Sequence, residues 1–212
     1  MKEFIDGPLW YFSLTVFSIG VIWRLVPLVF GKRGTDLSVP RGSAVSGAVQ
    51  AVIGRFIPHK GMASQVSMQV IAGYMFHLGL FAVLFFAAPH VRFLDEHFLG
   101  FSWTPLPHWA FIVASQFAFL GLLMLWLHRV TNLVSRLIST RGDHVGSILT
   151  FVVMLTGCLA LLESFEELRL LHRFSVELFL IYFPFSRLMH TFTFIPSRAF
   201  TGAWFGLRGI KA

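Results

Sequence analysis

Two histidines bracket an apolar segment near the C-terminal end of the sequence, HRFSVELFLIYFPFSRLMH, from His172 to His190. Their spacing corresponds to about five turns of an α-helix at about 3.6 residues per turn, so a single helix would present both imidazoles on one side. At about 1.5 Å per residue they would lie about 27 Å apart, close to the ~30 Å hydrocarbon thickness of a bilayer. This geometry predicts two stacked cofactors, one near each membrane face. The alternative is two unrelated histidines at helix ends.

The composition places these histidines in a membrane protein. Of the 212 residues, 56% are hydrophobic, 16% are aromatic and only 13% are charged, whereas a soluble domain has about 25% charged residues. The net charge of +7 fits basic loops beside a membrane better than a nucleic-acid site. Cys158 is the single cysteine, which excludes a disulfide framework, a CxxCH haem attachment and a cysteine-ligated iron–sulfur cluster built from this chain alone.

Five apolar stretches are long enough to cross a bilayer as helices. They predict an all-α integral membrane protein, with five transmembrane helices in a bundle that forms a single domain of residues 1–212. We read the first stretch as a retained helix rather than a cleaved signal peptide, because no small-residue cleavage site follows it. The predicted spans are about 8–30, 66–88, 107–128, 145–162 and 172–194.

The loop at residues 32–64 is basic and contains apolar residues at helical spacing. These residues are Val45, Val49, Val52, Ile53 and Phe56. The pattern predicts a short amphipathic helix that lies on the membrane surface or forms a docking face for a partner protein.

Lysine and arginine are distributed unevenly between the predicted loops. Eleven lie after the first span, after the third span and in the C-terminal tail, and only four lie on the opposite side. Because cytoplasmic loops are enriched in basic residues, this asymmetry predicts an outside N-terminus and a cytoplasmic C-terminus in the cell inner (cytoplasmic) membrane.

The predicted topology assigns a depth to each histidine and so predicts two pairs. His77 and His190 lie toward the cytoplasmic face, and His90 and His172 lie toward the outer face. Two histidines on facing helices are the usual axial ligands by which a helix bundle holds b-type haem. Zinc is a weaker alternative, since a structural zinc site requires four ligands that are commonly cysteines.

The fourth ligand is the least determined from the sequence. His90 follows His77 by 13 residues, which on one straight helix would turn it about 140° away from the face of His77. Pro89 removes a helical hydrogen bond and allows a bend at this point. His97 and His108 remain alternatives on the outer side.

The segment YFPFSRLMHTF, with a histidine 18 residues before His190, resembles the gamma subunit of respiratory nitrate reductase. It is similar also to the related DsrM-like and TmcC-like cytochrome b subunits of sulfur-metabolising membrane complexes. MFHLGLF around His77 resembles the FHIG segment on the second helix of that family. In the nitrate reductase subunit a second histidine follows on this helix at a spacing of ten, where this chain has Ala87. The resemblance therefore favours one of the related complexes.

The resemblance implies a five-helix membrane cytochrome with two b haems that passes electrons between the quinone pool and an iron–sulfur partner subunit. It implies His77 and His190 as ligands of the inner haem and His172 as a ligand of the outer haem. The chain has no soluble domain of its own, so we assign it no catalytic residue. The substrate-reducing site is expected on the partner, docked at the cytoplasmic basic loops.

Quinone chemistry also needs a group that accepts protons. Glu163, Glu166 and Glu167 lie near the outer end of the last span, and Glu177 lies within it, where a carboxylate is costly and suspected of function. The alternative for Glu177 is a structural ion pair with Arg173, one helical turn earlier.

Arg187, three residues before His190, is a possible partner for a haem propionate. The alternative function is a haem-free membrane transporter or scaffold subunit, which would need a polar path or a broken helix near the membrane midplane.

Overall fold

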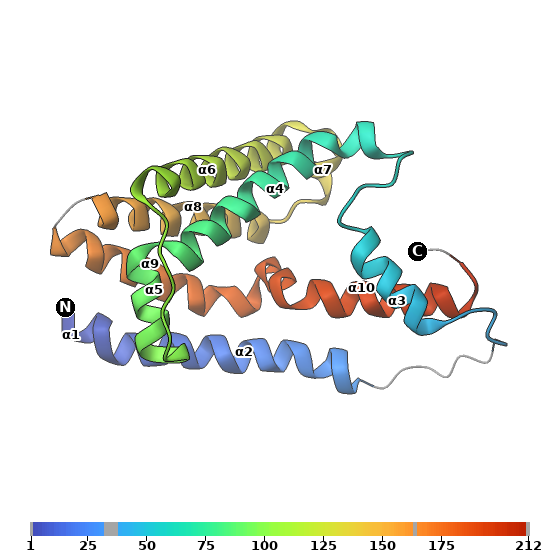
Figure 1. Ribbon diagram of the computed structural model, residues 1–212, viewed down its shortest axis with the longest axis horizontal. Coiled ribbons are helices and arrows are strands. Elements are labelled where there is room, and N and C mark those ends of the chain that lie inside the picture. Colours follow the sequence, from blue (N-terminus) through green and yellow to red (C-terminus); the bar gives the residue numbers. More distant parts are fainter. Residues whose placement is uncertain (1, 32–37, 163–164, 211–212) are drawn as a thin grey trace. The chain divides into compact units, whose positions relative to one another are not determined.

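The computed structural model describes residues 2–31, 38–162 and 165–210. Every secondary-structure element in these ranges is a helix (Figure 1). The elements are α1 (Lys2–Phe4), η1 (Ile5–Leu9), α2 (Trp10–Phe30), α3 (Ala44–Gly54), α4 (Ala63–Phe86), α5 (Ala88–Leu94), η2 (Asp95–Leu99), α6 (His108–Thr131), α7 (Leu133–Ile138), α8 (Arg141–Leu162), α9 (Glu166–Tyr182), η3 (Phe183–Phe185), η4 (Arg187–Met189) and α10 (His190–Leu207). Glu163 and the loop residues 32–37 lie outside the described residues.

The described helices include several of membrane-spanning length. Four are long and apolar enough to cross a bilayer: Lys2–Phe30, Ala63–Phe86, His108–Thr131 and Arg141–Leu161. Glu166–Phe185 and Arg187–Leu207 form a pair bent by 79°, which would add a fifth crossing if it is counted as one span. The prediction of an all-helical, multi-pass membrane protein is therefore confirmed.

The chain divides into two compact units. Unit 1 contains residues 1–63 and 173–212, and unit 2 contains residues 64–172. The boundary falls inside α9, which begins in unit 2 and ends in unit 1. His77, His90 and His172 consequently belong to unit 2, and His190 belongs to unit 1.

The apolar segment from His172 to His190 is interrupted. Two 3₁₀ turns, η3 and η4, separate α9 from α10. Pro184 lies at the start of η3, where it has no N–H to continue the helical hydrogen bonds. Ser186 follows in an extended conformation, with ψ of 173°, and its side chain caps η4. The expectation of one continuous five-turn helix with both imidazoles on the same side is therefore wrong.

The break packs closely against α2 within unit 1. Val21, Phe183 and Met189 form a buried apolar cluster there. A Cβ atom on Gly20 would lie only 2.5 Å from the Cβ of Pro184, far inside van der Waals contact. Gly20 therefore allows α2 to approach the proline ring.

We expect Gly20→Ala to lower the free energy of unfolding by about 1–3 kcal/mol, the usual cost of adding a methyl group to a packed site. Gly54→Ala is the control in the same unit, because a Cβ there meets no atom within 4 Å. Thermal unfolding of both variants in detergent, followed by circular dichroism, measures the difference. Equal midpoints for the two variants would contradict the close packing of Gly20 on Pro184.

Helices α3 and α10 lie side by side in unit 1 (Figure 1). Their contact is made of small residues, because a Cβ on Gly202 would lie 2.5 Å from the Cβ of Ala51 and a Cβ on Gly206 would lie 2.8 Å from the Cα of Gly47. Glycine pairs of this kind let two helix backbones approach closely. Val45 and Val49 of α3 are exposed, whereas Val52 is half-buried.

Unit 2 is built on a second close helix contact, between α4 and α6. A Cβ on Gly79 of α4 would lie 2.7 Å from the backbone nitrogen of Ala118 on α6. Ala118, Leu122 and Met154 form a buried cluster in this unit, so α8 joins the same core. This frame positions His90 and His172.

Candidate functional site

The structure brings His90 and His172 together in unit 2. Their ring centroids are 6.2 Å apart and their planes differ by 25°. Both side chains are half-buried. His90 lies on the short helix α5 and His172 in the first half of α9, so the two residues come from distant parts of the sequence.

The separation of these rings suits a shared metal ion. Two imidazoles that bind one metal from opposite sides, each through a nitrogen about 2 Å from the metal, have ring centroids roughly 6 Å apart. Haem iron takes its equatorial ligands from the porphyrin, so the protein supplies only the axial side chains. In the described part of the chain, no three His, Cys, Asp or Glu side chains form a group that could hold a metal ion. Two imidazoles are fewer than the four ligands of a structural zinc site and equal the number of axial side chains that a b-type haem can take from a protein.

A break in the helix between α4 and α5 sets the position of His90. Helix α4 ends at Phe86, Ala87 is extended, and α5 begins with Pro89 in its first turn, where proline costs no helical hydrogen bond. The Nδ1 of His90 then lies 3.0 Å from the carbonyl oxygen of Leu84. The last carbonyls of a helix have no partner within it, so His90 provides one at the end of α4.

His172 is held by a hydroxyl group. Its Nδ1 lies 3.2 Å from the Oγ1 of Thr156 on α8. Thr156 was not singled out by the sequence, because a threonine within an apolar helix commonly bonds only to its own backbone. The Nδ1 atom of each histidine therefore lies within hydrogen-bonding distance of an oxygen atom.

His77 and His190, predicted to be the inner pair, lie in different units, and their pairing stays a prediction. The Nδ1 of His77 is 2.7 Å from the carbonyl oxygen of Gly73, and the Nδ1 of His190 is 2.9 Å from that of Arg187. Metal-binding histidines usually donate this second N–H to such an acceptor. The feature is not specific to ligands, since the exposed His97 makes the same bond to Phe93.

Glu177 is the most deeply buried acidic residue among the described residues of unit 1. It is 2% exposed, and its Oε2 has no hydrogen-bond partner among the described residues. The predicted ion pair of Arg173 with Glu177 is not the one observed, because the Arg173 guanidinium pairs with Asp6 at the other end of the chain. Asp6 and Arg173 still interact electrostatically with Glu177. Unit 1 thus contains a buried carboxyl next to an ion pair.

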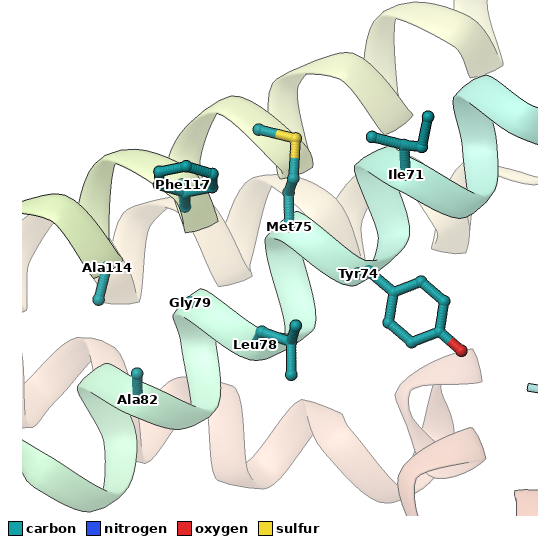
Figure 2. Close-up of a pocket in the computed structure, with 8 residues that line it drawn as sticks. All are labelled: Ile71, Tyr74, Met75, Leu78, Gly79, Ala82, Ala114 and Phe117. Atoms are coloured by element: carbon teal, nitrogen blue, oxygen red, sulfur yellow. The ribbon is translucent and has the colours of Figure 1, made fainter.

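An apolar groove of about 440 Å³ runs along α4 and α6 in unit 2 (Figure 2). The groove is lined by small residues at Gly79, Ala82 and Ala114 and by larger side chains such as Phe117. Its lining residues are apolar apart from Tyr74, and none of them is a histidine or a carboxylate. The candidate site is therefore the histidine pair and not this groove.

The comparisons with known proteins identify a relative over nearly the full length. A protein of Nitratidesulfovibrio vulgaris (strain Hildenborough), described simply as "Protein", is 30% identical over 218 residues, which cover 98% of this chain and 95% of the relative. The chain belongs to the family of that protein. No family model matches this member of the family, and no solved structure matches it.

Proposed function

We propose that this protein is a dihaem cytochrome b subunit of a respiratory oxidoreductase complex, which transfers electrons between the quinone pool and an iron–sulfur partner subunit. The observation that carries the proposal is the proximity of His90 and His172, whose ring centroids are 6.2 Å apart, in a protein with several membrane-length helices. Bound haem would supply one-electron chemistry, and the histidines would set its position.

Four histidines are the proposed iron ligands. His90 and His172 would hold the outer haem b, and His77 and His190 the inner haem b. The exposed Arg187, whose carbonyl engages the ring of His190, is the proposed partner of a propionate. Arginine matches a carboxylate geometrically through two parallel N–H donors.

Glu177 is the proposed proton-accepting group at the quinone site. A carboxyl that is buried without a hydrogen-bond partner for one oxygen is costly to maintain in a membrane segment. The Arg173–Asp6 pair is its charged neighbour, and both of these side chains are partly exposed. This arrangement favours proton exchange between Glu177 and the membrane edge.

The partner subunit is proposed to dock on the cytoplasmic side, with the protein in the cell inner membrane and its N-terminus outside. Basic residues favour this orientation. Neither the sequence between Asp36 and Asp95 nor that after Glu177 contains an acidic residue. Helices α3 and α10 fall in these two stretches, so neither helix carries an acidic residue that would repel an acidic protein surface.

A haem-free transporter is the second candidate, because the break between α9 and α10 is one of the features that such a protein needs. The packing of side chains at the break between α9 and α10 does not favour a substrate path there. Phe183, Pro184 and Met189 are buried there, and the hydroxyl of Ser186 bonds to the backbone of Phe183. The break is therefore filled by apolar side chains.

Reduction by quinol tests the proposed function directly. Purified protein loaded with haem is mixed with menadiol, and the haem absorption bands are followed in time. We expect the b haems to become reduced by the quinol alone. Haems that dithionite reduces but menadiol does not would contradict a quinone-reactive role.

A further inference from the structure

Thr156 and Gly157, two adjacent residues of α8, contact the imidazole of His172 in unit 2. Thr156 places its Oγ1 3.2 Å from Nδ1 of His172. At Gly157, an added Cβ would lie 3.0 Å from Cε1 of the same ring and 3.4 Å from both ring nitrogens. The ring therefore lies directly over Gly157, with the Thr156 hydroxyl at one edge.

The Thr156 hydroxyl has two backbone acceptors within reach besides the ring of His172. Its Oγ1 lies 2.9 Å from the carbonyl oxygen of Val152 and 3.1 Å from that of Val153. A hydroxyl has one proton to donate, and these carbonyls can only accept it. When the hydroxyl proton is donated to one of these carbonyls, the hydroxyl oxygen accepts from Nδ1–H of His172, and Nε2 then carries the lone pair.

We infer that Thr156 and Gly157 are positioning residues that hold His172 in the Nε2-ligating tautomer and thereby tune the outer haem. This inference rests on the proposed function. An acceptor on the second nitrogen fixes the orientation of a metal-binding imidazole and raises its basicity. His90 obtains the same support from the backbone carbonyl of Leu84, which no substitution removes. Of the two groups next to the Nδ1 atoms of His90 and His172, only the Thr156 hydroxyl can therefore be removed by a substitution.

The test compares Thr156→Val with Thr150→Val in the haem-loaded protein. Thr150 is a buried threonine of the same helix, and its hydroxyl bonds to the carbonyl oxygen of Gly146, so it controls for loss of a buried hydroxyl. The measurements are haem content per chain, haem affinity from titration of apoprotein, and the midpoint potential of each haem from a spectroscopic redox titration.

For Thr156→Val we expect haem affinity at one site to fall about 10- to 100-fold, the usual effect of losing such a partner. The potential of that haem should rise, because a less basic imidazole stabilises ferric iron less. Thr156→Ser should restore both values, and Gly157→Ala should change the spectrum of the same haem by displacing the ring.

Wild-type affinity and potential in Thr156→Val would overturn the inference and leave the proposed function intact. If Thr156→Val does not fold, Thr156→Ala and Gly157→Ala decide by the same readouts, with an unchanged outer haem counting against the inference. A wild-type protein that binds no haem would instead refute the proposed function itself.

Discussion

Replacing His172 by Ala is expected to reduce the haem b content from about two to about one per chain. The imidazole of His172 lies near that of His90, with 6.2 Å between the ring centroids. Removal of one proposed ligand would leave a bound haem with a single protein ligand. His90→Ala should have the same effect, and the double variant should lose no further haem, because the two residues serve one site. Pyridine haemochrome assays against protein concentration provide the measurement.

His97→Ala is the matched control for this prediction. His97 is also in unit 2 and makes an Nδ1 contact of 3.1 Å to the carbonyl oxygen of Phe93, but it is exposed. Its replacement should leave both haems in place. The assignment of the outer pair would be wrong if His97→Ala lost a haem while His90→Ala kept both.

Glu177→Gln is expected to slow quinol oxidation by about 100-fold or more while leaving haem content and absorption spectra unchanged. General acid–base groups contribute about 10²–10⁴-fold to proton-coupled steps, and an amide cannot accept the quinol proton. The amide has nearly the same volume as the carboxyl, so the packing of this residue, which is 2% exposed, is preserved. Menadiol-dependent reduction of haem, measured by stopped flow, gives the rate.

Glu167→Gln provides the comparison on the same helix, since Glu167 lies in the first turn of α9 and is exposed. We expect its rate to match the unmodified protein. A wild-type rate in Glu177→Gln would assign Glu177 to a structural role beside Arg173 and Asp6.

The membrane-length helices could be predicted from sequence because hydropathy reports the length of apolar runs directly. Because hydropathy is averaged over many residues, it does not reveal a break in the helix within an apolar segment. Pro184 and Ser186 lie among phenylalanines, so the segment containing them still reads as one span although the helix breaks there. The proline was the available signal, since it cannot continue the helical hydrogen bonds.

The sequence could not predict which side chains from remote parts of the chain contact one another. Arg173 has a carboxylate one turn away at Glu177, yet its partner is Asp6, which no local spacing indicates. In the sequence, Thr156 and Gly157 are ordinary small residues of an apolar helix. The structure shows that His172 of α9 lies beside them. His90 could be predicted as a site residue because Pro89 indicates a bend in the chain. In the structure this bend places the ring of His90 next to the carbonyl oxygen of Leu84.

The most direct test of the account is a reduced-minus-oxidised absorption spectrum of the purified chain combined with pyridine haemochrome quantification. The account predicts b-type bands and two haems per chain. One haem per chain would retain a single histidine pair and refute the dihaem assignment. A well-folded preparation that stays without haem, even when haem is supplied during expression, would contradict the proposed function.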